Sequence, residues 1–446
     1  MGKAAALRVA PTARAPTGVL KRETELGSNL PYARHVSDHV VALDSRALMI
    51  CFKLDGASFE TADVRDINDW HAKLNNAWRN LADERLAIWT HIVRREDRGY
   101  PEGKFRSDFA RGLDAEYRKR VTGTRLFTND LYVTLVLHPG RDAAERAAAF
   151  FGRLRARSKA GLEVDEDAIR TLEDKGRDLL QYLSRYDVRP LGLYEHNGLW
   201  FSEPMELLHL VLTGRPQRMP LVRGHLGHAL YTCRVIFGRE ALEIREPGEE
   251  KFAGIFGVKE YPAATRPGLW DGLLRAKYPF VATQSFAFLS KASARAIMER
   301  KQNQLIKAND RAHSQVDGLN DAIDDLVSNR FVMGEHQFSM LVYGASTKEL
   351  ADNMSAARAT LADSGLVVAR EDLALEAAFW AQFPGNFAKR SRPAAINSRN
   401  FAALSPFHTY PSGRSSGNRW GPAVALLRTS ALSPFYFNFH AGDLGH

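Results

Sequence analysis

Short apolar, β-rich runs alternate with longer amphipathic segments along this chain, and this alternation limits its fold more than any other feature. The first two runs, 39–44 and 47–54, surround Ser45 and Arg46 and predict a hairpin whose second strand is largely buried. Apolar residues then recur at spacings of three and four over 62–81, which predicts an amphipathic helix packed on that hairpin. Strands that alternate with helices in this way predict layers of sheet and helix, an α+β fold with antiparallel or mixed sheets packed by helices.

The same patterns place the other elements. The longest helical pattern covers 292–329 and predicts two core helices with a break near Gly318, with one long helix as the alternative. Further strands are predicted at 86–94, 130–137, 230–237, 241–245, 252–261, 280–288 and 336–343, with a strand pair around Asn197 and Gly198. Further helices are predicted at 105–120, 141–155, 165–185, 204–212 and 347–364.

The length of the chain predicts more than one domain. It has 446 residues, 45% of them hydrophobic, whereas single cores stop growing at roughly 250–300 residues. The connector TGRPQRMP marks a boundary near residue 220. We therefore expect a basic disordered tail over 1–29, a first α/β domain over 30–220, a second α/β domain with long helices over 221–415, and a strand pair over 416–446.

Charge is concentrated at the two ends of the chain. The net charge is +9, of which residues 1–35 carry +4 (6 Lys/Arg, 2 Asp/Glu) and residues 385–446 carry +6 (7 Lys/Arg, 1 Asp/Glu), so the remainder carries −1. A nearly neutral body is unlike the continuous basic surface of a nucleic-acid-binding protein. The charge therefore predicts local contacts at each end, with anionic lipid or an acidic neighbour.

Two further observations concern the compartment. The chain has no apolar run near the roughly 18 residues that span a bilayer, which predicts a soluble or peripheral protein. Its two cysteines, Cys51 and Cys233, stand apart among apolar residues, which indicates buried free thiols in a reducing compartment. We expect a cytoplasmic location.

Patterns that resemble catalytic or metal sites fail on their context. Residues 413–417 match G-x-S-x-G, but a nucleophile elbow needs a strand before it and a helix after it, and this segment has neither. His225 and His228 are spaced as HLGH without the further ligands that zinc requires. The sequence therefore predicts no catalytic residue and no metal site in this chain.

A phosphate-binding loop is also missing from the sequence. No segment matches G-x-x-x-x-G-K-[ST], and GASTKEL at 344–350 has the lysine without the preceding glycine or the spacing. We expect no nucleotide cofactor in this chain and no ATP hydrolysis by the chain alone, and we expect no complete RecA-like domain.

Both ends of the chain resemble one protein family. The opening LPYARHVSDHVVALDSRALMICFKLDGASFE at 30–60 and the blocks FWAQFPGN, NFAALSPFH, GNRWGPA and SPFYFNFH near the other end resemble the CagE/TrbE/VirB family of type IV secretion and conjugation ATPases. The similarity covers most of the chain from about Leu30. The carboxy-terminal similarity is carried by Trp380, Pro384, Gly385, Asn386, Asn400, Phe401, Gly417, Trp420, Gly421, Tyr436, Phe437, Asn438 and His440.

This resemblance implies the amino-terminal portion of a VirB-type secretion ATPase. In the family, a RecA-like carboxy-terminal domain binds ATP and Mg²⁺ and energises pilus assembly and the transfer of protein or DNA. The amino-terminal portion docks on inner-membrane channel subunits and other secretion ATPases and contributes to self-association, as a hexamer in full-length members, at the cytoplasmic face of the inner membrane. The strand pair over 416–446 then leads into a nucleotide-binding domain whose P-loop lies beyond residue 446.

The resemblance also suggests candidate residues near a nucleotide. Arg414 and Arg419, with Arg390 and Arg392, present guanidinium groups suited to phosphate or to an acidic neighbour. The alternative is a solvated basic loop. The final hairpin is predicted to be poorly supported, because strands meant to meet another domain leave an edge and an apolar face uncovered.

Other functions remain open at this point. A nucleic-acid-binding module is one alternative, and it predicts DNA affinity that falls steeply with salt. A scaffold subunit of a transfer apparatus without a P-loop is another, and a self-contained enzyme with an unrecognised site is a third. A truncated ATPase, a split gene and a natural form without a P-loop all agree with the sequence.

Overall fold

The computed structural model describes residues 26–101, 103–139, 165–307, 313–419 and 421–439. The predicted helix at 141–155 and nearly all of the predicted tail lie outside these residues. No helix among the described residues has both the length and the apolar content needed to cross a bilayer.

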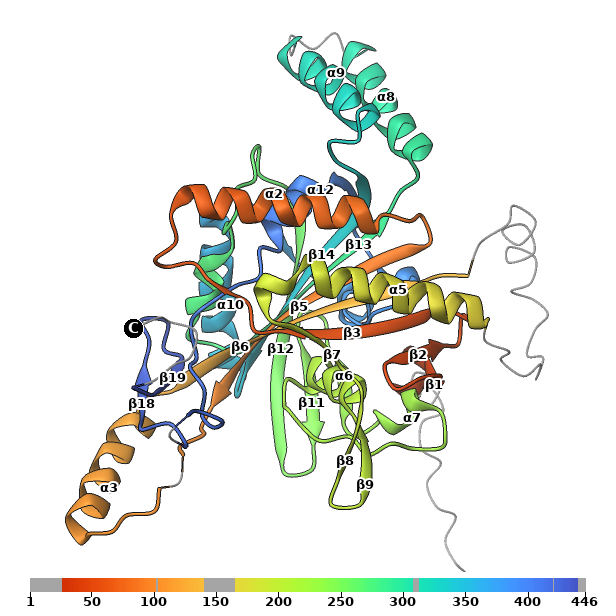
Figure 1. Ribbon diagram of the computed structural model, residues 1–446. Helices are drawn as coiled ribbons and strands as arrows, with labels where there is room; N and C mark the ends of the chain where they lie inside the picture. The colour runs from red at the N-terminus through yellow and green to blue at the C-terminus, as the bar shows by residue number, and fades with distance from the viewer. Residues whose placement is uncertain (1–25, 102, 140–164, 308–312, 420, 440–446) are drawn as a thin grey trace, which may run out of the picture.

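One large sheet forms the centre of the molecule (Figure 1). Thirteen of the described strands belong to it, and every pairing within it is antiparallel, so the predicted α+β class is confirmed. The strands are β1 (Tyr32–His35), β2 (Val40–Leu43), β3 (Leu48–Leu54), β5 (Leu86–Asp97), β6 (Leu126–Leu137), β7 (Val188–Pro190), β10 (Arg234–Phe237), β11 (Leu242–Glu246), β12 (Glu249–Glu260), β13 (Phe280–Phe288), β14 (Met333–Gly344), β15 (Val367–Arg370) and β16 (Ala394–Asn397).

The sheet contains the same arrangement of strands twice. In the first half, β3, helix α2 (Val64–Leu81), β5, β6, helix α5 (Glu166–Tyr182) and β7 follow one another, and the strands lie in the order β7-β3-β6-β5. In the second half, β12, β13, β14, helix α10 (Thr347–Asp363) and β15 lie in the order β15-β12-β14-β13. Both halves therefore have the strand order of a βαββαβ, or ferredoxin-like, unit. In the second, a segment with the short helix η3 (Asp271–Arg275) replaces the first helix.

The two units are joined edge to edge. Strand β5 pairs with β13 from Phe280↔Arg94 to Ala287↔Ala87. The predicted boundary near residue 220 falls between the two units, and one sheet runs through both.

The sheet has a hydrophobic layer on each face. Helices α2, α5 and α10 and helix α12 (Ser398–Leu404) pack on one face, where Trp78 is completely buried. The other face is covered by helices α6 (Glu203–Thr213), α7 (Leu226–Ala229) and α11 (Leu375–Trp380) and by η1 (Leu26–Asn29). Cys51 and Cys233 are buried free thiols in this second layer, as predicted.

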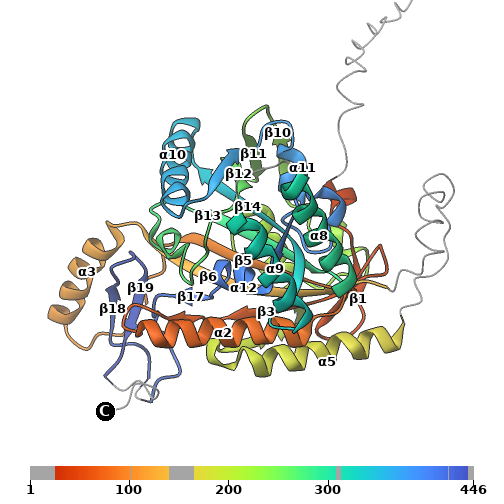
Figure 2. The same ribbon diagram turned by 90° about the horizontal axis from the view of Figure 1, so that it is seen from above.

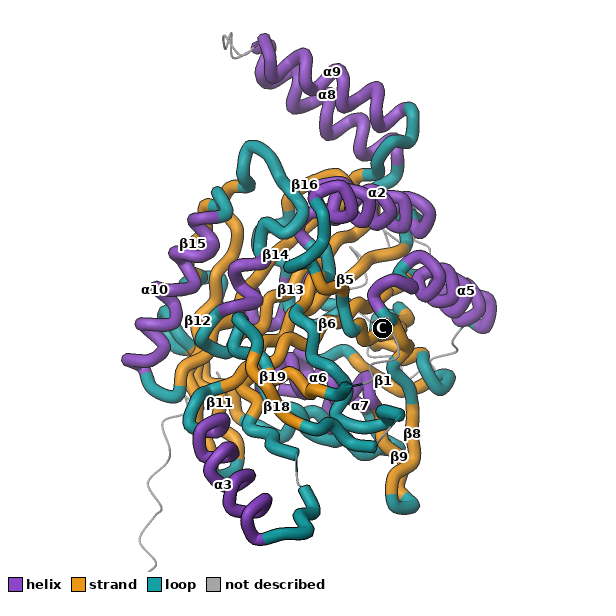
Figure 3. Tube along the Cα trace, turned by 60° about the vertical axis from the view of Figure 1, so that its left-hand side comes forward, coloured by secondary structure: helices purple, strands orange, loops and turns teal. Residues whose placement is uncertain are grey.

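Helical inserts extend from the two ends of the sheet (Figures 1 and 3). Helix α3 (Asp108–Thr122) lies between β5 and β6, and helices α8 (Lys291–Lys307) and α9 (His313–Val327) lie between β13 and β14. The two inserts thus occupy equivalent positions in the two units. Gly318 lies inside α9, so the predicted break there is wrong, because a single glycine weakens a helix by only about 1 kcal/mol.

Smaller elements complete the described fold. Three two-stranded sheets stand apart from the main sheet: β4 (Ala57–Ser58) with β17 (His408–Thr409), β8 (Leu193–His196) with β9 (Leu199–Ser202), and β18 (Ala425–Arg428) with β19 (Pro434–Phe437). Two short helices, η2 (Ser184–Tyr186) and η4 (Phe387–Lys389), lie in connections.

Candidate functional site: the carboxy-terminal hairpin

The strand pair predicted near the end of the chain is present as β18 and β19. Its register runs from Ala425↔Phe437 to Arg428↔Pro434. Helix α3 lies beside the hairpin (Figure 2), where the Tyr117 hydroxyl donates a hydrogen bond of 2.7 Å to the carbonyl oxygen of Leu426.

The turn of this hairpin is anchored to the main sheet. The backbone N–H of Phe127 donates to the carbonyl oxygen of Leu432 at 2.8 Å, and Ala431 is only 1% exposed. The expectation of a poorly supported hairpin is therefore wrong at the turn. Its support comes from the ends of β5 and β6, which the sequence does not place next to residue 431.

Arg94 is the central anchor. It lies in β5 and is completely buried, and its guanidinium donates to the carbonyl oxygens of Ala276 (2.6 Å) and Ala431 (3.0 Å) and to Oδ1 of Asn129 (2.9 Å). The group also lies 4.9 Å from the ring centroid of Phe127. Burial lowers the pKa of Arg94 to about 10, so the group stays charged at neutral pH.

The outer side of the hairpin and the neighbouring helix expose apolar side chains. Val424 is 59% exposed, Leu427 is 41% exposed and Phe439 is 72% exposed. On α3, Phe109 is 81% exposed and Leu113, one turn later, is also exposed. We call these five residues the hairpin face. Exposed apolar groups on two adjacent elements are typical of a surface that contacts another protein domain.

A polar cavity of about 190 Å³ lies where the hairpin meets the sheet. The Asp130 carboxylate is close to two cations, with Arg95 Nε at 2.7 Å and Lys53 Nζ at 3.3 Å. Asp55 adds a second carboxylate, so the charges in the wall balance, and a polyphosphate would gain little there. The lining residues are Lys53, Asp55, Arg95, Thr128, Asn129, Asp130, Thr409, Tyr410, Ser412, Ser433 and Pro434.

The predicted arginines separate into two groups. Arg414 and Arg419 lie on the exposed loop that precedes β18, and Asn418 donates to the carbonyl oxygen of Arg414 at 2.8 Å within that loop. Arg390 and Arg392 instead form ion pairs with the body of the protein, with Glu335 and Glu371 respectively, each at 2.9 Å. The structure does not bring the four together.

The rejected motifs have structural roles. Residues 413–417 form a loop, as expected, and Gly413 has a φ of +65° beside the backbone of Tyr436. His225 contacts Asp44 at 2.8 Å, and no group of metal ligands is found among the described residues. GASTKEL starts α10, where Ser346 is the N-cap: its hydroxyl accepts from the Glu349 N–H, and the Glu349 carboxylate accepts from the Ala345 N–H.

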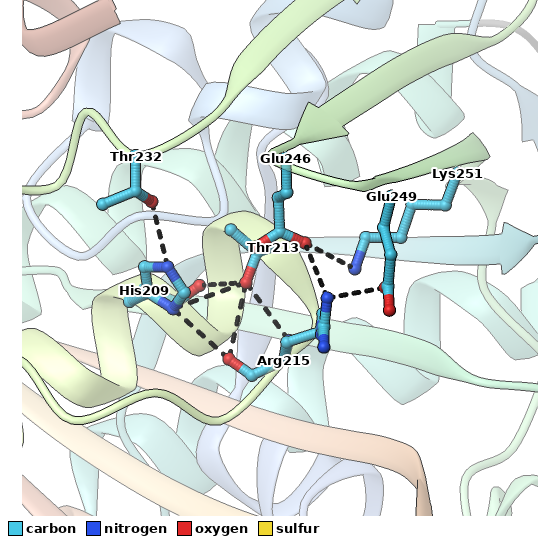
Figure 4. Close-up of polar contacts among 7 residues, drawn as sticks. All are labelled: His209, Thr213, Arg215, Thr232, Glu246, Glu249 and Lys251. Atoms are coloured by element: carbon cyan, nitrogen blue, oxygen red, sulfur yellow. Dashed lines mark hydrogen bonds and ion pairs between the residues drawn. The ribbon is translucent and has the colours of Figure 1, made fainter.

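A second polar cluster, which the sequence did not indicate, lies between α6 and the β11–β12 hairpin (Figure 4). His209 is completely buried, and its Nε2 lies 3.0 Å from the Thr232 hydroxyl. Lys251 Nζ lies 3.5 Å from Glu246 Oε2. The cluster comprises His209, Thr213, Arg215, Thr232, Glu246, Glu249 and Lys251.

The contacts of this cluster support a structural role. Arg215 Nη1 lies 2.6 Å from Glu249 Oε2, which ties the end of α6 to β12. Burial lowers the pKa of both His209 and Lys251, because a charge is poorly solvated there. The cluster therefore connects the first unit to the second. Its members are spread from 209 to 251 without a motif spacing, so no sequence signal identifies it.

Comparison with known families gives two matches. Residues 189–392 match the family described as CagE, TrbE, VirB family, component of type IV transporter system. Residues 39–144 match the family described as type IV secretion system ATPase VirB4/TrbE, N-terminal domain. The segment 39–144 lies in the first unit of the sheet, and the segment 189–392 runs from β7 through the second unit.

Curated relatives align over nearly the whole chain. The type IV secretion system protein virB4 of Bartonella quintana is 52% identical over 428 residues, which are 96% of this chain and 55% of that protein. The protein virB4 of Agrobacterium tumefaciens is 39% identical over 430 residues, 96% of this chain and 54% of that protein. The type IV secretion system protein PtlC of Bordetella pertussis is 34% identical over 436 residues, which are 96% of this chain and 52% of that protein.

The chain thus spans about half the length of the curated relatives that it matches. The match over 39–144 overlaps the opening at 30–60, and the match over 189–392 includes the block FWAQFPGN at 379–386. The chain belongs to the CagE, TrbE, VirB family of type IV transporter components.

Proposed function

We propose that this chain is the amino-terminal docking and assembly portion of a VirB4-type secretion ATPase. The complete ATPase would energise pilus assembly and the translocation of protein or DNA. Its P-loop, with ATP and Mg²⁺, would lie in the half of the relatives' length that this chain does not span. The proposal is supported by the match of residues 39–144 to an N-terminal domain and by the lengths of the relatives.

The observation that carries this proposal is the arrangement of the hairpin. Its turn is fixed by Arg94 and Phe127, whereas its outer strands and α3 expose the five apolar side chains of the hairpin face. A rigid base under an uncovered apolar surface suits a contact with a second domain, because little ordering entropy is lost on docking. In this proposal the hairpin face packs against the nucleotide-binding part of the ATPase.

The same proposal gives the exposed arginines a role. Arg414 and Arg419 lie on the loop next to the hairpin face, and a neighbouring nucleotide-binding part would bring phosphate or acidic groups within their reach. Inner-membrane channel subunits, other secretion ATPases and further copies of the ATPase, assembled as a hexamer, are the proposed partners. The proposed location is the cytoplasmic face of the bacterial inner membrane.

Two measurements test this function. The 446-residue chain alone should neither bind nor hydrolyse ATP with Mg²⁺ in a calorimetric titration and a phosphate-release assay. In the ATPase that carries this chain together with the remaining half, Phe109→Ser with Leu427→Ser should lower ATP turnover several-fold, as should Arg414→Ala with Arg419→Ala.

The matched control is Leu373→Ser, because Leu373 is 101% exposed and lies in a loop away from the hairpin. It should leave turnover unchanged. ATP hydrolysis by the chain alone would contradict the proposal, and so would normal turnover in both double variants.

A further inference from the structure

The β8–β9 hairpin presents two large apolar side chains at its tip. Leu199 is 62% exposed and Trp200 is 53% exposed, immediately after the turn at Asn197 and Gly198. Both turn residues have positive φ, +53° and +76°, which gives the tight turn typical of two-residue hairpin loops. The hairpin projects from the main body of the molecule (Figure 1).

The base of this hairpin is rigid and does not use those two side chains. The rings of Tyr194 and Phe201 stack at 5.5 Å between centroids, and the Tyr194 hydroxyl donates to Glu206 of α6 at 2.6 Å. Ser202 is completely buried and caps α6. Trp200 and Leu199 therefore contribute little to the packing of the base and are held outward by it.

Arginines and a further leucine lie along the same hairpin. The N–H of Leu221 donates to the carbonyl oxygen of Trp200 at 2.8 Å, so the segment before α7 runs beside β9. Leu221 is 37% exposed. Arg218 and Arg223 flank it and are exposed, and neither forms an ion pair with another described residue. One acidic side chain, Glu195, lies opposite Trp200 across the strand pair.

We propose that Leu199, Trp200, Arg218, Leu221 and Arg223, here called the tip surface, bind the surface of an anionic phospholipid bilayer. Trp200 and Leu199 enter the headgroup region, and the two guanidinium groups contact lipid phosphates. The proposal deepens the proposed location at the inner membrane and rests on it. It names the residues that make the contact and the lipid charge that they recognise.

Three physical features favour a bilayer over a protein partner. Tryptophan prefers the membrane interface, because its ring is apolar and its N–H is polar. Arginine forms two parallel hydrogen bonds to phosphate, and a basic side chain near an anionic membrane contributes about 1 kcal/mol. The five residues of the tip surface are also far fewer than the roughly 20–30 residues that each partner contributes to a stable protein interface.

Vesicle flotation with this 446-residue chain tests the proposal. The chain should float with vesicles of equal parts phosphatidylglycerol and phosphatidylcholine and not with phosphatidylcholine alone, and added salt should weaken the binding. Leu199→Ser with Trp200→Ser should weaken vesicle binding at least tenfold, because both substitutions remove apolar surface that would otherwise be buried in the bilayer. Arg218→Gln with Arg223→Gln should weaken it roughly thirtyfold.

A gain of binding provides a stricter test. Glu195→Lys reverses the one acidic charge on the hairpin and should tighten binding to the anionic vesicles by roughly tenfold or more. A merely unfolded hairpin would not bind more tightly. Circular dichroism of each variant checks that the fold is retained.

Tryptophan fluorescence reports the depth of Trp200. Among the tryptophans that the structure describes, Trp70, Trp78, Trp89, Trp270 and Trp380 are buried and Trp200 is exposed. Anionic vesicles that contain brominated phosphatidylcholine should quench Trp200, and Trp200→Phe should remove most of that quenching while the chain still floats.

The control is Phe109→Ser with Leu113→Ser, an aromatic and aliphatic pair on α3 that is at least as exposed as Trp200 and Leu199. It should bind vesicles like the parent chain. The basic segment before Leu26 is the same in every variant, so its own attraction to lipid cancels. Equal flotation of the parent and the tip variants, or no quenching of Trp200, would overturn the proposal. ATP turnover of the hairpin-face variants tests the proposed function separately, because those variants keep the tip surface intact.

Discussion

The guanidinium of Arg94 donates a hydrogen bond of 3.0 Å to the carbonyl oxygen of Ala431, which lies 337 positions later in the chain. Because Arg94 is completely buried and its hydrogen-bond acceptors are neutral oxygens, the hairpin turn is held by a buried cation rather than by an exposed ion pair. This contact fixes the hairpin to the centre of the sheet.

Arg94→Met should destabilise the protein by about 3 kcal/mol, because three buried oxygens lose their donor while the volume is roughly kept. Denaturant unfolding measures the loss, and hydrogen exchange should show β18 and β19 opening more often than the main sheet. Arg428→Met, on the exposed side of β18, is the control and should change stability little. Equal stability of both variants would exclude the anchoring role.

A buried histidine should make stability depend on pH. His336 bonds to Gln284 Oε1 at 3.0 Å and to the Tyr261 hydroxyl at 2.7 Å, and burial lowers the pKa of His336 to about 3. In the unfolded chain the imidazole of His336 therefore takes up a proton near pH 6.5, whereas in the folded chain it stays neutral at that pH. This contribution to stability is complete above pH 6.5 and is lost as the pH falls towards 3.

His336→Gln tests this dependence. Urea unfolding at a series of pH values should give a shallower decline below pH 6.5 than in the parent chain. His91 should retain part of the decline, because burial lowers the pKa of His91 to about 4. His228→Gln, at an exposed position, should follow the parent curve, and a parent-like curve for His336→Gln would contradict the prediction.

Substitutions at the start of α10 distinguish a helix cap from a phosphate-binding loop. Ser346→Ala removes the hydroxyl that accepts from the Glu349 N–H and should cost about 1 kcal/mol. Lys348→Ala, on the same turn, should leave thermal unfolding almost unchanged. Loss of nucleotide binding in a Lys348 variant of the full ATPase would instead show that this segment has a phosphate-binding role.

Two glycines in the loop before β18 differ in their surroundings. A Cβ on Gly413 would clash with the carbonyl oxygen of Tyr436, whereas nothing lies within 4 Å of a Cβ on Gly417. Both have positive φ, +65° and +74°, so alanine is strained at each. Gly413→Ala should therefore make the hairpin open more often than Gly417→Ala does. Hydrogen exchange of the backbone amides over 425–437 measures this difference.

Local elements could be predicted from the sequence where one physical signal dominates. Residues 48–54 read as a buried strand because nearly every side chain is apolar, and β3 is buried along almost its whole length. Strands β15 and β16 were missed because each is only four residues long, the shortest apolar run that indicates a strand. The joining of the two units was missed for another reason. Strands β5 and β13 lie far apart in the chain, and their pairing depends on the whole sheet.

The candidate site was predicted only in outline. The carboxy-terminal strand pair follows from its apolar runs and turn residues, but its anchor does not. Arg94 stands in the sequence VRRED, which reads as the solvated end of a strand. Only the meeting of three distant segments gives that guanidinium its partners. The exposure of Trp200 likewise depends on how the rest of the chain leaves that hairpin uncovered.

The antiparallel pairing of β5 with β13 also has a mechanical consequence. The insert after β5 and the insert after β13 leave the sheet at opposite ends, because the two strands run in opposite directions. A force applied between α3 and the α8–α9 pair would act along these strands. It would load the hydrogen bonds from Phe280↔Arg94 to Ala287↔Ala87 together, in shear, instead of breaking them one after another. Tension between these two ends would therefore be opposed by all the hydrogen bonds of the β5–β13 pairing at once.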